Sequence, residues 1–188
     1  QHDDHWMDDF GEQLARAGYV VAINRYRLSA GVNNAAQFHD ALSKAFADQK
    51  AAIRYFVKDA RNDNRFRVDQ ENIFVGGHSA GAITALYVAY LDPQDSIDPS
   101  MKKMLQSYGG IEASDEDGVE PFRIRGVINL SGMVTDLEML DKLVIEIVLG
   151  WIHRVQRIRA SPPAIGVVTE VDQLGIVAMK EVRHFHRH

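Results

Sequence analysis

The chain has 188 residues, of which 46% are apolar and 25% charged, and its net charge is -5. This length and composition are those of one globular domain with a sizeable core, and they argue against wholesale disorder. Because there is no cysteine, disulfides, zinc–thiolate centres, iron–sulfur clusters and cysteine nucleophiles are excluded. The acidic net charge argues against non-specific nucleic-acid binding.

The distribution of apolar residues disfavours one further class, proteins that span a membrane. No apolar run reaches the roughly 18 residues that a bilayer-spanning helix needs. The polar, acidic residues 1–5 carry no signal peptide, which leaves both a cytoplasmic and a secreted location open.

Charge is unevenly distributed along the chain: residues 1–141 hold 14 Lys/Arg and 22 Asp/Glu, whereas residues 142–188 hold 7 Lys/Arg and 4 Asp/Glu. Such a reversal marks a domain edge or a segment of different history.

The amino-terminal part alternates predicted helices and strands. A first helix ends at Gly18, which suits the left-handed residue after a last helical turn. The next run, Tyr19–Ile23, is almost continuously apolar and predicts a strand buried on both faces, as in a parallel sheet. A long helix is predicted from Asn34 to Arg61, because its apolar residues recur at steps of three and four. Asn33 or Asn34 could cap its start.

The alternation continues beyond a polar turn. Ile73–Gly77 predicts a second buried strand, and Ala80–Leu91 predicts a helix rich in Ala, Leu and Val that Asp92-Pro93 ends. Ile124–Leu130 predicts a third strand. These elements favour an α/β fold, with a mostly parallel sheet and helices on both of its faces.

The pattern weakens beyond Asp141. Leu143–Val155 predicts an apolar helix, and Ala164–Val168 predicts a fourth strand after two prolines. The residues after this strand, as far as His188, mix polar and apolar types and predict no particular element. We therefore expect one domain over residues 1–188, with a divergent tail over 142–188.

Residues Gly77-His78-Ser79-Ala80-Gly81 form the pattern G-x-S-x-G between a predicted strand and a predicted helix. This context is typical of a nucleophile elbow, in which a strained serine stands at the apex of a sharp turn. Gly77 and Gly81 would let the two backbones pass, and His78 would pack beside the turn. The N–H of Ala80, at the helix N-terminus, would help to form an oxyanion hole.

Other glycine-rich motifs fail on one or two required positions. A P-loop that starts at Gly76 would need Lys and Ser or Thr where Ala82 and Ile83 stand. A dinucleotide-binding fingerprint would need glycine at His78. Neither a P-loop nor a dinucleotide-binding turn is therefore expected here.

Three stretches resemble the α/β-hydrolase fold, in its esterase/lipase branch. The first stretch, residues 10–28, is a helix and a strand followed by Tyr26-Arg27-Leu28. The second, residues 69–82, holds a strand and the G-x-S-x-G turn. Residues 127–132 look like the next strand. The resemblance covers about residues 10–140. The resemblance also implies early strands and a His-Gly-Gly oxyanion loop upstream of the first helix, and this sequence lacks both. We therefore expect a truncated α/β-hydrolase-like fold, with a possible open sheet edge beside Tyr19–Ile23 that dimerisation or the tail covers.

The resemblance implies a catalytic triad in the chain order Ser, acid, His. Ser79 would be the nucleophile. Asp172, in the turn Thr169-Glu170-Val171-Asp172, is the first candidate for the acid, and Asp136 is the second. His184 is the first candidate for the base, and His186 and His188 are the alternatives.

Two functions from different classes follow. The first is a carboxylesterase or lipase-like hydrolase that acts on a small-molecule ester of small or medium acyl length, without cofactor or metal. The second is a non-catalytic or weakly active hydrolase-like fragment or binding module, which keeps the turn at Ser79 but lacks the upstream oxyanion loop.

Overall fold

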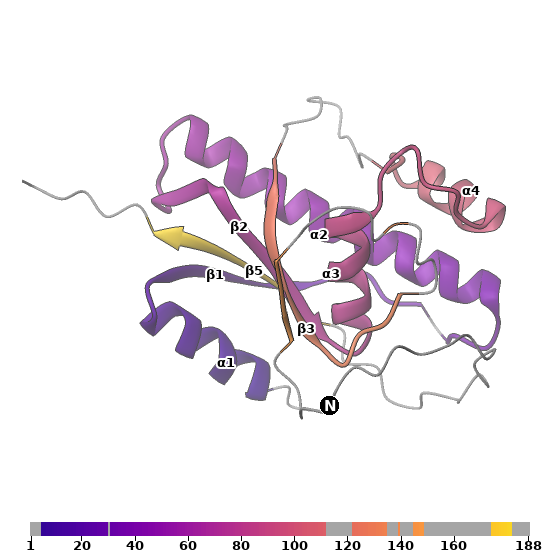
Figure 1. Ribbon diagram of the computed structural model, residues 1–188, viewed down its shortest axis with the longest axis horizontal. Coiled ribbons are helices and arrows are strands. Elements are labelled where there is room, and N and C mark those ends of the chain that lie inside the picture. The colour runs from indigo at the N-terminus through magenta and orange to yellow at the C-terminus, as the bar shows by residue number, and fades with distance from the viewer. Residues whose placement is uncertain are drawn as a thin grey trace, which may run out of the picture.

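The computed structural model describes residues 5–29, 31–111, 122–134, 139, 145–148 and 174–181 (Figure 1). In chain order the elements are α1 (His5–Arg16), β1 (Tyr19–Arg25), α2 (Ala35–Arg61), β2 (Val68–His78), α3 (Ala80–Tyr90), α4 (Pro99–Ser107), β3 (Ile124–Leu130), β4 (Ile145–Val148) and β5 (Leu174–Glu181). The alternation of helices and strands confirms the predicted α/β fold.

The five strands form one sheet in the order β1-β5-β2-β3-β4. β2, β3 and β4 are parallel neighbours, whereas β5 is antiparallel to both β1 and β2. Since β5 reverses direction between them, β1 and β2 point the same way. The sheet is thus mostly parallel, and the carboxyl ends of β1, β2, β3 and β4 lie at one edge.

Helices cover both faces of this sheet, with α1 on one side and α2 and α3 on the other (Figure 1). Side chains along β1 point alternately to the face that α1 covers and to the face that α2 and α3 cover. Tyr19, Val21 and Ile23 pack with Met7 of α1, while Val20 and Ala22 pack against the larger core. Both faces of β1 are therefore covered, as its apolar run predicts, although its side chains are only half-buried. The neighbour of β1 in the sheet is nevertheless antiparallel, because β1 pairs with β5.

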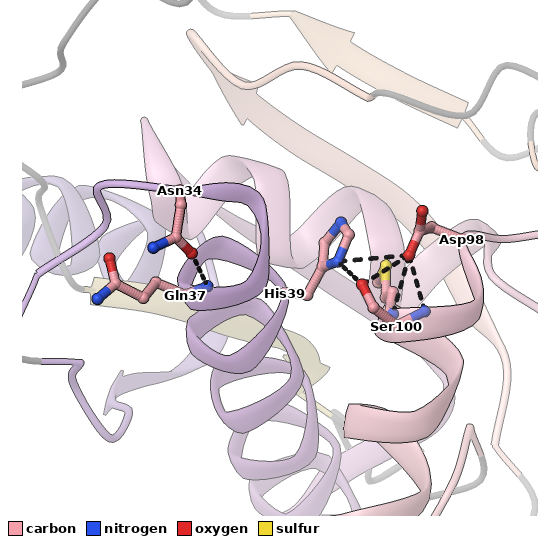
Figure 2. Close-up of polar contacts among 6 residues, drawn as sticks. Asn34, Gln37, His39, Asp98 and Ser100 are labelled. Carbon is pink, nitrogen blue, oxygen red and sulfur yellow. Dashed lines mark hydrogen bonds and ion pairs between the residues drawn. The ribbon is translucent and has the colours of Figure 1, made fainter.

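The ends of the first two helices follow from local chemistry. Gly18 has φ +92°, a left-handed conformation that costs glycine little, and it lets the chain turn from α1 into β1. Asn34 caps α2, since its side-chain oxygen accepts a hydrogen bond from the Gln37 N–H at 3.0 Å (Figure 2). Of the two predicted caps, Asn34 is the one used.

The tail departs from its predicted structure. Ile145–Val148, inside the predicted helix Leu143–Val155, form β4, which pairs with Gly126–Asn129 of β3. Three β-branched residues in this stretch and a free edge of β3 favour the strand over the helix. β5 was not predicted, and the predicted strand Ala164–Val168 lies outside the described residues. Within the part of the chain that the structure describes, no helix is both long and apolar enough to span a membrane.

Candidate functional site

Ser79 alone links β2, which ends at His78, to α3, which begins at Ala80. Its backbone has φ +51° and ψ -114°, outside the regions that residues with a side chain normally occupy. Such a conformation costs about 1–3 kcal/mol and persists only where the surroundings hold it in place. Ser79 is half-buried, so its side chain is not sealed inside the protein.

The turn is so tight that a side chain at Gly77 would collide with the helix. A Cβ atom at Gly77 would lie 2.5 Å from the carbonyl carbon of Gly81 and 2.7 Å from its oxygen. One at Gly76 would lie 2.7 Å from both the Cβ and the carbonyl oxygen of Ile128 in β3. The glycines before Ser79 thus allow close approach to α3 on one side and to β3 on the other.

The first turn of α3 leaves hydrogen-bond donors directed toward the sheet edge. The Ile83 N–H donates to the Ser79 carbonyl at 3.0 Å, which closes the first helical turn. The N–H of Ala80 precedes this ladder, and the N-terminus of a helix carries a partial positive charge. A developing oxyanion beside Ser79 would therefore meet a favourable field.

Other predicted site residues fall in two groups. His78 is half-buried at the end of β2, and Gly81 is buried in α3, so both flank Ser79 in the turn. The candidate acids, Asp172 and Asp136, and the candidate bases lie outside the described residues. Those bases are His184, His186 and His188.

A different Ser, His and Asp meet where α4 docks on α2 (Figure 2). His39 Nδ1 lies 2.6 Å from Ser100 Oγ and 3.7 Å from Asp98 Oδ1, and Ser100 Oγ donates to Asp98 Oδ1 at 2.6 Å. In a triad the acid binds the imidazole nitrogen that faces away from the serine. Here one nitrogen faces both groups, and the Ser100 proton points at the carboxylate, so Ser100 is not activated.

The same contacts show what this cluster does. Asp98 caps α4, since its carboxylate accepts the Ser100 N–H at 2.8 Å. Hydrogen bonds from the Ser100 side chain and backbone hold the pKa of Asp98 below its usual range. The hydroxyl of Ser100 then links this cap to His39, so the cluster fastens α4 to α2.

A second polar cluster, missed by the sequence patterns, surrounds Asp40 at the start of α2. Its carboxylate accepts hydrogen bonds from Lys44 Nζ at 2.5 Å and Tyr108 OH at 2.8 Å. Ser29 Oγ, in the loop after β1, donates at 3.3 Å. The hydrogen bonds from Lys44 and Tyr108 lower the pKa of Asp40, and the bond to Asp40 raises the pKa of Tyr108.

This cluster borders an open cavity of about 310 Å³. Its walls combine polar side chains of α2 with the loop after β1, and they are formed by Leu28, Ser29, Gly31, Asn33, Gln37, Asp40 and Lys44. Both Asp40 oxygens are already engaged by protein donors. The contacts explain how the loop is held to α2, and they give no recognisable catalytic arrangement.

No group of three or more His, Asp or Glu side chains in the described part of the chain could hold a metal ion.

Comparison with family models matches residues 1–148 to BD-FAE, a family of α/β-hydrolase-fold esterase-like domains. The chain belongs to the BD-FAE family. The comparisons with curated proteins and with solved structures found no significant match. The BD-FAE match includes the turn at Ser79 and ends at β4, before the tail strand β5.

Proposed function

We propose that this chain is a serine hydrolase of carboxylic esters, with Ser79 as the nucleophile. Membership of an esterase-like family supports a hydrolase at the coarse level. The observation that carries the finer proposal is the backbone of Ser79, with φ +51° at a one-residue link between strand and helix. That conformation presents a hydroxyl at the sheet edge, beside the N-terminus of α3.

The proposed reaction follows the acyl-enzyme route. Ser79 Oγ attacks the ester carbonyl while a histidine takes its proton, and the Ala80 N–H stabilises the tetrahedral oxyanion. The intermediate collapses to an acyl-serine as the alcohol leaves with that proton. Water, deprotonated by the same histidine, then attacks the acyl-serine, releases the carboxylic acid and restores Ser79. We propose His184 as the base and Asp172 as the acid that orients it.

We further propose an apolar substrate group of small or medium size, and two exposed apolar side chains at the same edge of the sheet as Ser79 support its apolar character. Met133 follows β3 and is 53% exposed, and Leu28 follows β1 and is also 53% exposed. Both follow the carboxyl ends of their strands, at the sheet edge where Ser79 stands. Exposed apolar side chains near such an edge are suited to contact an acyl chain or an apolar alcohol.

The experiment is hydrolysis of nitrophenyl acetate and butyrate by the wild type, Ser79→Ala and Ser107→Ala. Ser107 is an exposed serine of α4 whose hydroxyl donates to the Lys103 carbonyl, and it serves as the matched control. We expect Ser79→Ala to lose at least about 1,000-fold in kcat and Ser107→Ala to keep wild-type activity, because removal of a nucleophile leaves only binding and oxyanion stabilisation. Activity that survives Ser79→Ala would refute the proposal. An inert but folded wild type would favour the binding module instead.

A further inference from the structure

The last two residues of β3 and the two that follow them, Asn129–Gly132, contact both sides of the bend at Ser79. We call this segment the β3 turn. Gly77 pairs with Asn129 and His78 with Leu130 in the parallel ladder. Immediately beyond that ladder, the Ser79 N–H donates a hydrogen bond of 2.9 Å to the Leu130 carbonyl. The β3 turn thus holds the backbone of Ser79 from the strand side.

The β3 turn also reaches the helix side of the bend. A Cβ atom at Gly132 would lie 2.6 Å from the Cβ and 2.8 Å from the carbonyl carbon of Ala82, in the first turn of α3. A glycine is needed for this approach, since Cβ atoms essentially never come within 3.0 Å of heavy atoms of residues that are distant in the chain. Leu130 and Gly132 therefore hold the two ends of the same one-residue bend.

One side chain closes the β3 turn. Asn129 Oδ1 accepts the Gly132 N–H at 2.7 Å, a local hydrogen bond from a side chain to the backbone three residues on. Ser131, between them, has φ +63°, an unfavourable conformation for a residue with a side chain. The hydrogen bond of Asn129 holds this strained residue in place and so sets where Gly132 meets Ala82.

We propose that Asn129 is a positioning residue for Ser79, acting through the β3 turn. Ser79 is itself strained, and a strained backbone keeps its geometry only when its neighbours fix it from several directions. Loss of the Asn129 oxygen would release Ser131 and Gly132, which directly follow Leu130, and so would loosen the hold of the β3 turn on the backbone of Ser79. The expected effect on catalysis rests on the proposed function, whereas the expected effect on the backbone of Ser79 does not.

The catalytic test compares Asn129→Ala with Asn129→Ser and with Asn72→Ala. A serine hydroxyl can accept the same backbone N–H, so it should rescue the turn. Asn72 lies near the other end of β2 and donates to Asp69 Oδ2, which makes it a matched control. We expect Asn129→Ala to lower kcat on nitrophenyl butyrate about 10- to 100-fold with KM within about twofold of wild type, because a misplaced nucleophile costs rate. Asn129→Ser should recover most of that loss, and Asn72→Ala should lose nothing.

A second measurement separates this inference from the proposed function. Amide hydrogen exchange of Ser79, followed by NMR, reports its hydrogen bond to Leu130 whether or not the protein hydrolyses esters. We expect exchange at Ser79 to be about tenfold faster in Asn129→Ala, with amides of buried Ile53 and Val57 in α2 unchanged, because local opening does not need global unfolding. Unchanged exchange at Ser79, or equal acceleration at all three amides, would overturn the inference. A wild type without esterase activity would overturn the proposed function alone.

Discussion

The two neighbours of β2 differ in direction, and only one of them lies within the residues that match the BD-FAE family. On one side β2 pairs with the parallel β3, and Gly77 lies opposite Asn129. On the other side it pairs with the antiparallel β5, and Gly77 lies opposite Gly175. β3 falls within residues 1–148, which match the BD-FAE family, whereas β5 falls beyond them.

The two neighbours therefore have different roles: β3 shapes the candidate site, and β5 completes the sheet. The β3 side provides the Leu130 carbonyl that accepts the Ser79 N–H, and it provides Gly132 against α3. The β5 side joins β2 to β1, which would otherwise stand apart from the parallel strands. We infer that substitutions on the β3 side change reactivity first, and that substitutions on the β5 side change stability first.

The largest expected effect tests whether β5 is a true part of the core. Met179 of β5 is 0% exposed and packs in the same core as Met101 of α4, which is 1% exposed. Replacing a buried methionine by alanine removes apolar contacts and leaves a cavity, at a cost of about 2–5 kcal/mol. We expect Met179→Ala to lower the free energy of unfolding by about 3 kcal/mol, measured by urea denaturation.

Two further methionines calibrate this measurement. Met101→Ala should cost about as much as Met179→Ala, while Met133→Ala, at a side chain 53% exposed, should stay within about 0.5 kcal/mol of wild type. If Met179→Ala behaves like Met133→Ala, β5 does not contribute to the core and the comparison of the two sides of β2 fails.

The next effect addresses the tight approach at the bend. Gly77→Ala would place a methyl group 2.5 Å from a backbone atom of Gly81, and backbone cannot move aside as a flexible side chain can. We expect a loss of about 2–3 kcal/mol in unfolding free energy, together with loss of esterase activity, because the bend must open. Gly110→Ala is the matched control: it has φ +79° but open space around it, so we expect about 1 kcal/mol and full activity. Equal costs at the two glycines would contradict the proposed crowding.

The smallest effect concerns the cluster at Asp40, which helps to hold the loop after β1. The lowered pKa of Asp40, caused first by its hydrogen bond from Lys44 and then by that from Tyr108, means that the folded state favours the carboxylate. The Asp40 carboxylate therefore stabilises the folded state at neutral pH, and this stabilisation is lost as the pH falls through the lowered pKa. We expect Asp40→Asn to cost about 1 kcal/mol at pH 7 and progressively less below about pH 4.

Thermal unfolding of wild type and Asp40→Asn between pH 3 and pH 7 checks this dependence. Asp63→Asn, at an exposed carboxylate in the turn before β2, is the control and should stay within about 0.5 kcal/mol of wild type at pH 7. A stability difference for Asp40→Asn that stays constant down to pH 3 would show that the carboxylate charge has no part in the cluster.

Local chemistry made much of the fold predictable. Asn34 is a cap, Gly18 has positive φ, and the strands containing Tyr19–Ile23, Ile73–Gly77 and Ile124–Leu130 are all present, because each depends on residues close in sequence. β5 is different. Its run Gly175-Ile176-Val177-Ala178-Met179 is rich in apolar residues, and this could have indicated a strand, but its place between β1 and β2 depends on partners far away in the chain.

The candidate site shows the same division. The G-x-S-x-G pattern predicts a bend at Ser79 because its glycines and its flanking elements are local. The β3 turn could not be predicted, since the contact of Gly132 with Ala82 and the hydrogen bond from Ser79 to Leu130 exist only after β2 and β3 pair. The acid and base of the proposed triad, Asp172 and His184, stay predictions.

The central claim is that Ser79 is a reactive nucleophile, and covalent labelling tests it most directly. Folded wild-type protein is incubated with a fluorophosphonate, and the modified residue is mapped by mass spectrometry. The account predicts a single adduct on Ser79 and none in Ser79→Ala. No adduct on folded wild type, or an adduct on Ser100 with Ser79 unmodified, would contradict it.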